Sequence, residues 1–289
     1  ILILFHRLDC VIFKSSQLEV FNDVAQLNLP KNYEIGWMKS LNDETLLSEL
    51  TIPGTHDSLA LHGGPAAECQ AWSLNDQLKA GIRYFDLRVS ALGLIIMHGP
   101  IYQHTSFPEA FDTIKTFLSE YNTETVLVRV KPVIYLFKAT VQNLIGNMIE
   151  NDISWILEKI PTIGQVRGKI VFVQKKAFEL GISLTETDED KDYIVTDVTR
   201  KKEKIKSHLT KARDEKERAD KVFLIYSSGT GWPKLHVFKT PKNLAEAINP
   251  WLYDHLNNES KNNPKVCFGV IAMDFPGLDL IRKITELNN

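Results

Sequence analysis

Two scarcities in this sequence narrow the classes of protein that it can encode. Its 289 residues include only three cysteines, Cys10, Cys69 and Cys267, which lie far apart and form no metal-type pair. The odd number argues against a disulfide framework, although the redox compartment stays open. No run of 18 apolar residues occurs, so the sequence predicts no membrane-spanning helix. A chain of this length can bury a substantial core without disulfides.

An excess of one charge sign is also lacking. The formal net charge is −2, so no global basic field points to nucleic acid. The densest charge run, residues 199–221, mixes both signs, with Glu203 and Lys206 three positions apart. This spacing favours a solvated helix over a binding patch.

The first residues of the chain carry no clear targeting signal. They are apolar but are interrupted by His6, Arg7 and Asp9, and they lack an initiator Met and a small-residue cleavage site. We therefore interpret the chain as a fragment or a mature form. We expect residues 1–36 to be an N-terminal extension and residues 37–289 to form one barrel domain.

Eight short β-rich runs are interleaved with longer helical patterns. The predicted strands are residues 49–53, 82–89, 94–98, 125–131, 169–175, 192–198, 221–227 and 268–275. Between them, stretches such as 106–121 place apolar residues at helical spacing after a predicted N-cap, Ser106. This alternation predicts an α/β fold, a single-domain distorted (β/α)8 TIM barrel. The link SALGL between the second and third runs is too short for a helical crossover, so we expect an irregularity there.

Polar residues gather where the predicted strands end. They are Asp86, Arg88, His98, Arg129, Lys131, Lys175, Asp197 and Asp274. Any one of them could simply mark where a strand reaches water. Because most of the strands show this feature, and His56 and Asp57 follow the first one, we favour a functional site at the carboxyl ends of the strands.

Two of the histidines lie directly at the ends of predicted strands. An unperturbed imidazole titrates near pH ~6.5, so His56 and His98 can supply one neutral and one protonated ring near neutrality. With Asp57 and Asp274 nearby in the barrel, they predict a base and an acid. Arg88 suits a phosphate, because its planar guanidinium binds two oxygens and stays charged.

Two alternatives for these residues stay open. Arg88 could form a salt bridge with Asp86 at the rim of the barrel. Asp57, Asp86 and His98 could instead hold a divalent ion, but Arg88 would then add a positive charge close to it. We interpret the arginine as taking the role of a metal, and we expect no metal and no cofactor.

The motifs IPGTHDS, GIRYFDLRV, MHGPIY, ETVLVRVK, RGKIVFVQK, IYSSGTGW and FGVIAMDF follow one another in the chain. In this order they resemble the X-domain of phosphatidylinositol-specific phospholipase C in its small bacterial form. The resemblance runs from about Trp37 to the C-terminus and implies a distorted TIM barrel. Small stand-alone X-domain proteins of eukaryotes share GIRYFDLRV, so the source stays open.

The resemblance implies a role for each catalytic residue. His56 corresponds to the general base that takes the proton from the inositol 2-hydroxyl, and Asp274 to the carboxylate that orients it. His98 corresponds to the general acid that protonates the diacylglycerol oxygen, with Asp57 as its partner. Arg88 corresponds to the phosphate-binding arginine, where calcium-dependent relatives have an acidic ligand. The expected products are diacylglycerol and inositol 1,2-cyclic phosphate.

The resemblance also implies substrate-binding residues and partners. Lys131 and Asp197 match contacts with inositol hydroxyls, Asp86 belongs to the FDLR turn, and Lys175 falls where bacterial enzymes have arginine. The implied partner is a phosphatidylinositol-containing membrane surface, contacted transiently. We expect no nucleic-acid partner, a monomer, and a secreted or membrane-peripheral location.

Membrane contact predicts apolar residues at the rim of the barrel. The candidates are Trp37, Trp72, Trp232, Trp251 and the loops FPG and TGWP, with Trp232 foremost.

Three rival functions remain at this point. A metal-dependent glycerophosphodiester or sphingomyelin-type phosphodiesterase would lose activity in chelator, and Arg88 argues against it. A catalytically silent barrel that binds inositol lipids would not need both histidines and their supporting aspartates. An enzyme that cleaves GPI anchors by the same mechanism stays an open alternative.

Overall fold

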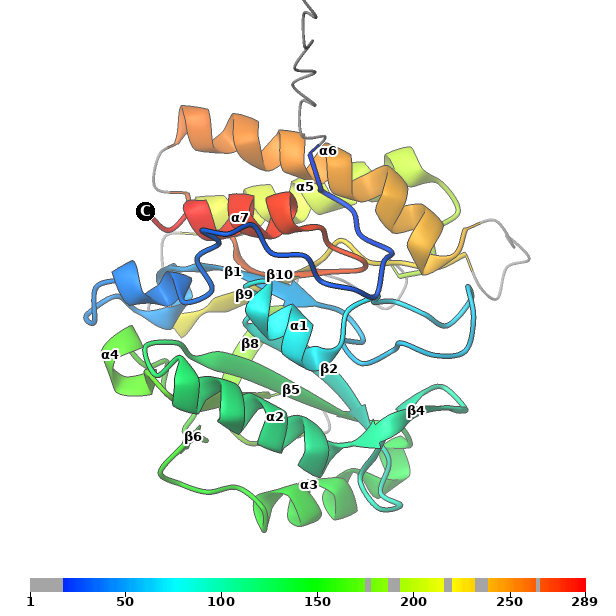
Figure 1. The fold of residues 1–289 in the computed structure, drawn as a ribbon, viewed down its shortest axis with the longest axis vertical. Helices are drawn as coiled ribbons and strands as arrows, with labels where there is room; N and C mark the ends of the chain where they lie inside the picture. Colours follow the sequence, from blue (N-terminus) through cyan, green and yellow to red (C-terminus); the bar gives the residue numbers. More distant parts are fainter. Residues whose placement is uncertain (1–17, 175–177, 187–192, 216–219, 232–238, 264–265) are drawn as a thin grey trace, which may run out of the picture.

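A closed ring of parallel strands forms the centre of the molecule (Figure 1). The computed structural model describes residues 18–174, 178–186, 193–215, 220–231, 239–263 and 266–289. Within these residues the ring holds, in spatial order, β1 (Thr51–Thr55), β10 (Gly269–Met273), β9 (Val222–Tyr226), β8 (Ile182–Glu186), β7 (Ile170–Gln174), β5 (Val126–Pro132) and β2 (Tyr84–Val89). Pairing between β2 and β1 closes it. The predicted distorted TIM barrel is confirmed.

One predicted strand leaves the ring as a hairpin. Residues 94–98 supply β3 (Ile95–His98), which runs antiparallel to β2 and pairs with β4 (Ile101–Ser106). A link of five residues can only turn the chain back on itself, whereas a parallel neighbour needs a crossover of a dozen or more residues. The expected irregularity is therefore a reversal of direction, and β3 is not a barrel strand.

A second strand prediction, residues 192–198, is wrong. Within the described part of this run, Ile194 makes a single bridge with Thr230, and Asp197 already caps a helix. The ring is instead completed by β8, whose sequence ISLTE is more polar than the predicted run. β8 pairs with both β7 and β9, so backbone pairing rather than apolar content defines this strand.

Helices cover the ring on its outside. In Figure 1, α5, α6 and α7 lie on one side of the strands, and α2 and α3 lie on the other. The helices are α1 (Leu74–Lys79), α2 (Phe107–Glu120), α3 (Lys138–Gly146), α4 (Ile163–Val166), α5 (Val198–Asp214), α6 (Pro241–Asn262) and α7 (Leu278–Glu286). Shorter elements are β6 (Ser154–Trp155), η1 (Trp37–Ser40), η2 (Leu47–Glu49) and η3 (Tyr135–Phe137).

The start of α2 illustrates how local sequence fixes these helices. The Ser106 hydroxyl accepts from the Glu109 backbone N–H, and the Glu109 carboxylate accepts from the Ser106 N–H. This capping box satisfies two backbone donors that the first turn leaves unpaired. Phe107, Phe111 and Ile114 then recur on one face and are buried. The predicted N-cap and helix are confirmed.

Side chains along β5 alternate between two environments. Val128 and Val130 pack in the apolar cluster between strands and helices. Leu127 packs in a second apolar cluster, inside the ring. Successive strand residues point to opposite faces, so Arg129 and Lys131 follow Leu127 on the inner face. The interior is therefore apolar near the start of the strand and charged near its end.

Strand β2 repeats this pattern. Tyr84 belongs to the inner apolar cluster, and Phe85 and Leu87 belong to the outer one. Asp86 and Arg88 share the inner face with Tyr84 and lie nearer the carboxyl end of the strand. Since Arg88 pairs in register with the Lys131 position of β5, the charged ends of both strands meet at one end of the ring.

The segment before η1 packs against the barrel. The backbone N–H of Asn22 donates to the Phe275 carbonyl over 3.0 Å. The Tyr33 hydroxyl donates to the Ala80 carbonyl over 2.6 Å, and the Arg83 guanidinium donates to the Ile35 carbonyl over 2.6 Å. Hydrogen bonds of this kind attach the described part of the predicted N-terminal extension to the barrel.

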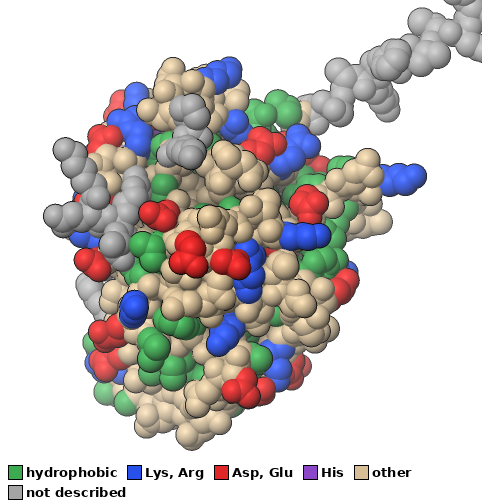
Figure 2. Space-filling view, turned by 90° about the vertical axis from the view of Figure 1, so that its left-hand side faces the viewer, with side chains coloured by type: hydrophobic (Ala, Val, Ile, Leu, Met, Phe, Trp, Pro, Cys, Tyr) green, Lys and Arg blue, Asp and Glu red, His purple; other side chains and the backbone are tan. Residues whose placement is uncertain are grey.

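The mixed surface charge and the free thiol of Cys69 agree with what the composition predicts. Figure 2 shows the molecule from the left of Figure 1, away from the β3–β4 hairpin, and basic and acidic side chains are mixed there. In the described part of the chain, no helix combines the length and the apolar character needed to cross a bilayer. Cys69 carries a free, buried thiol, whereas Cys10 lies outside the described residues.

Candidate active site

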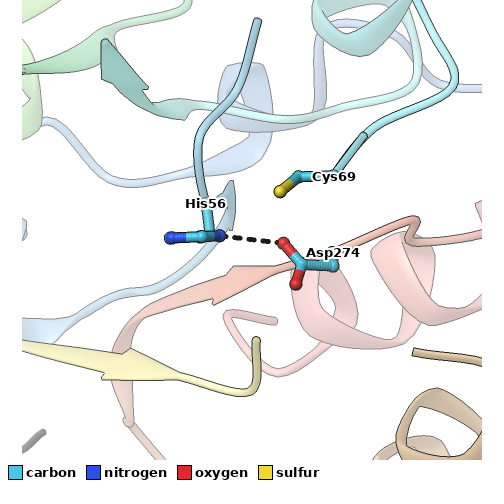
Figure 3. Close-up of side chains that lie close together, drawn as sticks. All are labelled: His56, Cys69 and Asp274. Carbon is cyan, nitrogen blue, oxygen red and sulfur yellow. Dashed lines mark hydrogen bonds and ion pairs between the residues drawn. The ribbon is translucent and has the colours of Figure 1, made fainter. Parts of the chain in front are cut away.

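The end of β1 and the end of β10 bring a histidine and a carboxylate together. Thr55 pairs in register with Met273, so His56 and Asp274 leave adjacent strands side by side. Nδ1 of His56 lies 3.0 Å from Oδ1 of Asp274, and both residues are buried (Figure 3). Because a carboxylate accepts, Nδ1 carries the hydrogen and Nε2 of the ring faces the site. The predicted orienting role of Asp274 is compatible with this geometry.

The backbone around His56 is held from several directions. Its N–H donates to the Met273 carbonyl over 2.9 Å, and its carbonyl accepts from the Gln70 side chain over 2.8 Å. Asp57 then adopts a φ of +41°, in the left-handed region that a residue with a side chain seldom enters. The Ser58 N–H donates to the Asp86 carbonyl and secures this turn. The turn allows His56 and Asp57, although adjacent in sequence, to face the same site.

The Asp57 carboxylate lies between both predicted catalytic histidines. Its Oδ2 lies 3.3 Å from Nε2 of His56 and 3.4 Å from Nε2 of His98. Its Oδ1 forms an ion pair with Nε of Arg88. The Asp57 side chain is buried, so its charge acts on all three partners with little screening by water.

A hydrogen bond on the side of the His98 imidazole that faces away from Asp57 shows which ring nitrogen carries a hydrogen. Nδ1 of His98 lies 2.6 Å from the Ala67 carbonyl, which can only accept, so Nδ1 carries a hydrogen. The other ring nitrogen, Nε2 of His98, faces Oδ2 of Asp57.

Arg88 contacts both His56 and Asp57. Its NH2 lies 3.2 Å from Nε2 of His56, and its Nε pairs with Asp57. Burial alone would lower the pKa of Arg88, but the carboxylates of Asp57 and Asp86 outweigh burial and raise it. The site therefore holds a permanent positive charge beside His56, with some of the guanidinium open to solvent.

The pKa values of the buried groups follow from their neighbours. Burial alone would lower the pKa of His56, but Asp57 and Asp274 outweigh it and raise the pKa above its ordinary value. Burial raises the pKa of Asp274. Groups with such opposing influences are typical of catalytic sites.

Asp86 pairs with Arg129, whereas the alternative considered above was a salt bridge with Arg88 at the rim. Its Oδ1 lies 3.8 Å from Nε of Arg129, whose NH2 donates to Oε1 of Glu186 over 2.5 Å. The Arg129 guanidinium lies 5.7 Å from the centre of the Tyr226 ring. Burial would raise the pKa of Asp86, but Arg129 and Arg88 outweigh it and hold the pKa below its usual range. Asp86 and Arg129 thus form a charged layer inside the ring.

Three predicted substrate contacts have different positions. Lys131 lies next to Arg88 across the β2–β5 pair, and burial followed by the Arg88 charge lowers its pKa. Asp197 is exposed and accepts from the Arg200 N–H over 3.1 Å as the N-cap of α5. Lys175 lies outside the described residues. Of the two contacts that lie within the described residues, Lys131 is at the site and Asp197 is not.

Two aromatic rings beside His56 were missed by sequence reasoning. The Tyr193 ring lies 5.0 Å from the imidazole, and the Tyr226 ring lies 5.7 Å from it, edge-on. Tyr193 belongs to the run that we predicted as a strand ending at Asp197, so its position was misjudged. Tyr226 ends β9 on the inner face, and an aromatic residue at a strand end was the available signal.

Several groups lie close enough to share a cation. Ligand atoms of His56, Asp57 and Asp86 fall within 4.8 Å of one another, as do those of His56, Cys69 and Asp274 (Figure 3). Burial raises the pKa of the Cys69 thiol well above its usual value, which opposes the thiolate that a metal prefers. Arg88 already contacts Asp57 and His56, so its charge occupies the place where a cation would act.

The predicted membrane residues need correction. Trp37 and Trp72 are buried, and Nε1 of Trp37 donates to the Gly81 carbonyl. Trp251 is half-buried and stacks on His255. In the loop FPG, Phe275 is also buried. Trp37, Trp72 and Phe275 were expected at the rim of the barrel, but each of them packs into the core.

Trp232, the foremost candidate, and most of the loop TGWP lie outside the described residues.

Comparison with known proteins identifies the family. The family model for the X domain of phosphatidylinositol-specific phospholipase C matches residues 44–176. A 1-phosphatidylinositol phosphodiesterase of Listeria monocytogenes is 30% identical over 284 residues, which cover 87% of this chain and 84% of the relative. The chain belongs to the phosphatidylinositol-specific phospholipase C family. The resemblance predicted from the motifs is confirmed.

Further phosphatidylinositol-specific phospholipases C support the assignment. The solved structure of the Listeria monocytogenes enzyme has a TM-score of 0.76 and covers 89% of this chain and 99% of its own. A 1-phosphatidylinositol phosphodiesterase of Staphylococcus aureus (strain Newman) is 27% identical, over 91% of this chain and 97% of the relative. A solved structure of a Staphylococcus aureus phosphatidylinositol-specific phospholipase C has a TM-score of 0.71 at 24% identity and supports the fold alone. It covers 88% of this chain and 97% of its own.

Proposed function

We propose that this protein cleaves the phosphodiester of phosphatidylinositol through attack by the inositol 2-hydroxyl of the substrate. The products are diacylglycerol and inositol 1,2-cyclic phosphate. The observation that carries the proposal is the convergence of His56, Arg88 and His98 on the carboxylate of Asp57. Family membership and relatives named 1-phosphatidylinositol phosphodiesterase support the substrate class. GPI anchors contain the same reacting group and are the alternative substrate.

His56 acts as the general base in this proposal. Asp274 holds the Nδ1 hydrogen of the ring, which leaves Nε2 free to take the proton of the 2-hydroxyl. The resulting imidazolium faces Oδ2 of Asp57 at 3.3 Å, and that carboxylate stabilises its charge. Because the substrate supplies the nucleophile, no Ser or Cys is needed, and its fixed position gives a high effective concentration.

Arg88 and His98 act on the phosphate and on the leaving group. The Arg88 guanidinium stabilises the charge that develops on the non-bridging oxygens. His98, with its Nδ1 hydrogen held by Ala67, donates the Nε2 proton to the departing diacylglycerol oxygen. Arg88 thus supplies the positive charge that a metal supplies in calcium-dependent relatives, and the metal-dependent rival is disfavoured.

Substrate contacts follow from position. Lys131 lies beside Arg88 at the open end of the ring and contacts an inositol hydroxyl in this scheme. Asp86 supports the inositol side of the site from the layer below. We assign the catalytic barrel to residues 37–289 and treat residues 1–36 as an extension. The protein acts as a monomer and reaches its lipid transiently, as a secreted or membrane-peripheral enzyme.

Phosphorus NMR tests the proposal directly. Purified protein is incubated with phosphatidylinositol in detergent micelles and excess EDTA. A phosphorus signal for a five-membered cyclic phosphodiester is expected as the first product, and a His56→Ala variant serves as control. A phosphomonoester appearing first, or activity that requires added metal, would reject the mechanism. Absence of any cleavage by the wild type would favour the silent lipid-binding barrel.

A further inference from the structure

A buried glutamine joins the hairpin that carries His98 to the loop that follows β1. Gln103, on β4, exposes 2% of its surface. Its Oε1 accepts from the backbone N–H groups of Leu61 and His62, each over 2.9 Å. Its Nε2 donates to the His62 carbonyl over 3.1 Å and to the Ile101 carbonyl over 3.3 Å. Both lone pairs of the amide oxygen and both amide hydrogens are thus used.

The same loop supplies the hydrogen bond that orients the His98 ring. Nδ1 of His98 donates to the Ala67 carbonyl over 2.6 Å. The Ala67 N–H donates to the Gly64 carbonyl over 2.9 Å, which closes a turn that begins two residues after His62. A displacement of the loop at His62 would therefore also displace the Ala67 carbonyl.

The loop and the hairpin also pack closely where His98 lies, and Figure 1 shows them side by side at the right of the barrel. Ile101 pairs in register with His98 across the hairpin. An added Cβ on Gly63, which has a φ of +114°, would lie 2.7 Å from Cδ1 of Ile101. His104, next to Gln103, has a φ of +56°. Such a strained backbone persists where surrounding contacts fix it, so this junction is tightly held.

We propose that Gln103 is a positioning residue for His98. The two residues lie on one hairpin, and both are hydrogen-bonded to the loop of residues 61–67. These bonds and the two chain segments form a closed circuit, so the Gln103 amide sets where the Ala67 carbonyl meets Nδ1 of His98. The inference rests on the proposed function, in which His98 protonates the leaving oxygen.

The His98 ring has a competing acceptor on its other side. Nε2 of His98 lies 3.4 Å from Oδ2 of Asp57. In a neutral imidazole one nitrogen carries the hydrogen, and the better-placed acceptor decides which. Loss of the Gln103 amide should therefore move the hydrogen from Nδ1, where Ala67 accepts it, to Nε2, where Asp57 accepts it.

Histidine NMR measures this tautomer without turnover. The protein carries isotope-labelled histidine, and a spectrum of His98→Ala identifies the His98 signals. At alkaline pH, where the ring is neutral, wild-type His98 should carry its hydrogen on Nδ1. In Gln103→Met, which has a side chain of similar length and no amide, the hydrogen should move mainly to Nε2.

Gln103→Glu is the second variant, in case Gln103→Met does not fold. Its carboxylate still accepts from Leu61 and His62 but cannot donate to the His62 and Ile101 carbonyls. It should move the His98 tautomer in the same direction. Unfolding of both variants would assign Gln103 to stability alone and overturn the positioning role.

Two substrates distinguish a misplaced acid from a general loss of structure. Phosphatidylinositol releases a strongly basic alkoxide that needs a proton, whereas the nitrophenyl ester of inositol 1-phosphate releases a weakly basic phenolate. Gln103→Met should lower kcat on phosphatidylinositol roughly 10-fold or more, and on the nitrophenyl ester by less than about 3-fold.

The matched control is Gln70, a second buried glutamine. Its Nε2 donates to the His56 carbonyl over 2.8 Å and to the Met273 carbonyl over 2.9 Å. Gln70→Met therefore disturbs the base instead of the acid. Since the base is needed with either leaving group, kcat should fall by the same factor on both substrates, and the His98 tautomer should stay as in the wild type.

The outcomes separate the two proposals. An unchanged His98 tautomer in Gln103→Met, or an equal loss of kcat on both substrates, overturns the positioning role. The same selective loss in Gln70→Met overturns it too, because the effect would then not be specific to the hairpin. A wild type that cleaves neither substrate overturns the proposed function, while the tautomer still decides whether Gln103 positions His98.

Discussion

NH2 of Arg88 lies 3.2 Å from Nε2 of His56. A guanidinium only donates, so this contact requires a lone pair on Nε2 and hence a neutral ring with its hydrogen on Nδ1. Once Nε2 gains a proton, its acceptor is instead Oδ2 of Asp57, 3.3 Å away. The two protonation states of His56 therefore have separate partners already in place. In the proposed mechanism, Arg88 binds the phosphate and also contacts the unprotonated form of the base.

Substitutions of Arg88 test whether it replaces a metal. Arg88→Lys keeps the charge but loses the two-pronged fork, so turnover should fall roughly 10²-fold or more, the usual cost of losing a transition-state donor. Arg88→Asp places a third carboxylate near Asp57 and Asp86, and millimolar calcium should partly restore its activity. Initial rates in EDTA and in calcium provide the measurement. Wild-type activity that disappears in EDTA and returns with calcium would refute the assignment.

Alanine variants of the two histidines test the assignment of base and acid. His56→Ala and His98→Ala should each lower turnover by at least ~10²-fold with the fold retained, because each removes a proton-transfer partner. A substrate with a better leaving group needs less protonation, so it should rescue His98→Ala more than His56→Ala. Equal rescue of the two variants would mean that the roles are wrongly assigned.

The pH dependence of kcat/KM tests the role of Asp274. The base must be unprotonated, so activity falls as the pH drops through the pKa of His56, which Asp57 and Asp274 raise above the ordinary value of about 6.5. Asp274→Asn removes one of these carboxylates. The acidic limb of the profile should move to lower pH, although the maximum also falls because the ring is held less well.

The control for this profile is Asp112→Asn, a carboxylate exposed on α2. It should leave the acidic limb in place. An Asp274→Asn profile that differs from the wild type only in height would show that Asp274 does not tune the base.

We expect the charged layer of Asp86 and Arg129 inside the ring to contribute strongly to the free energy of unfolding. Arg129→Met leaves Asp86 and Glu186 without their guanidinium, and loss of one member of a buried pair costs about 3–5 kcal/mol of unfolding free energy. Urea unfolding measures this loss. Arg200→Met, on the surface of α5, should change stability by no more than about 0.5 kcal/mol.

A double variant tells whether the pair itself is responsible. Arg129→Met combined with Asp86→Asn should lose less stability than the two single losses added together, since the second change removes a charge that the first one exposed. Strict additivity would argue that Arg129 acts mainly through Glu186 or through packing.

The sequence predicts well those residues whose positions depend on strand ends alone. His56, Arg88, His98 and Asp274 each follow or end a β-rich run, and parallel strands deliver their carboxyl ends to one place. His98 reaches the site even though its strand runs antiparallel, because the short link limits how far β3 can travel. The motifs around these residues were sufficient to indicate the family.

Features that depend on pairing between distant parts of the chain could not be predicted from the sequence. The polar run ISLTE becomes β8 only because two neighbouring strands offer it backbone partners. Arg129, noted merely as a polar strand end, proved to neutralise Asp86 within the barrel. The exposure of Leu136 and Phe137 after β5 was also missed, because large apolar residues resemble core residues in a sequence.

Closure of the ring has a consequence for how the protein is made. β1 needs β10 on one edge, yet His56 and Asp274 are separated by 218 positions. Ribosomes add about 5–20 residues per second, so roughly ten to forty seconds pass between synthesis of His56 and synthesis of Asp274. During that interval one edge of β1 stays open and the imidazole is not held. A growing chain therefore cannot assemble the His56–Asp274 pair until β10 has been synthesised.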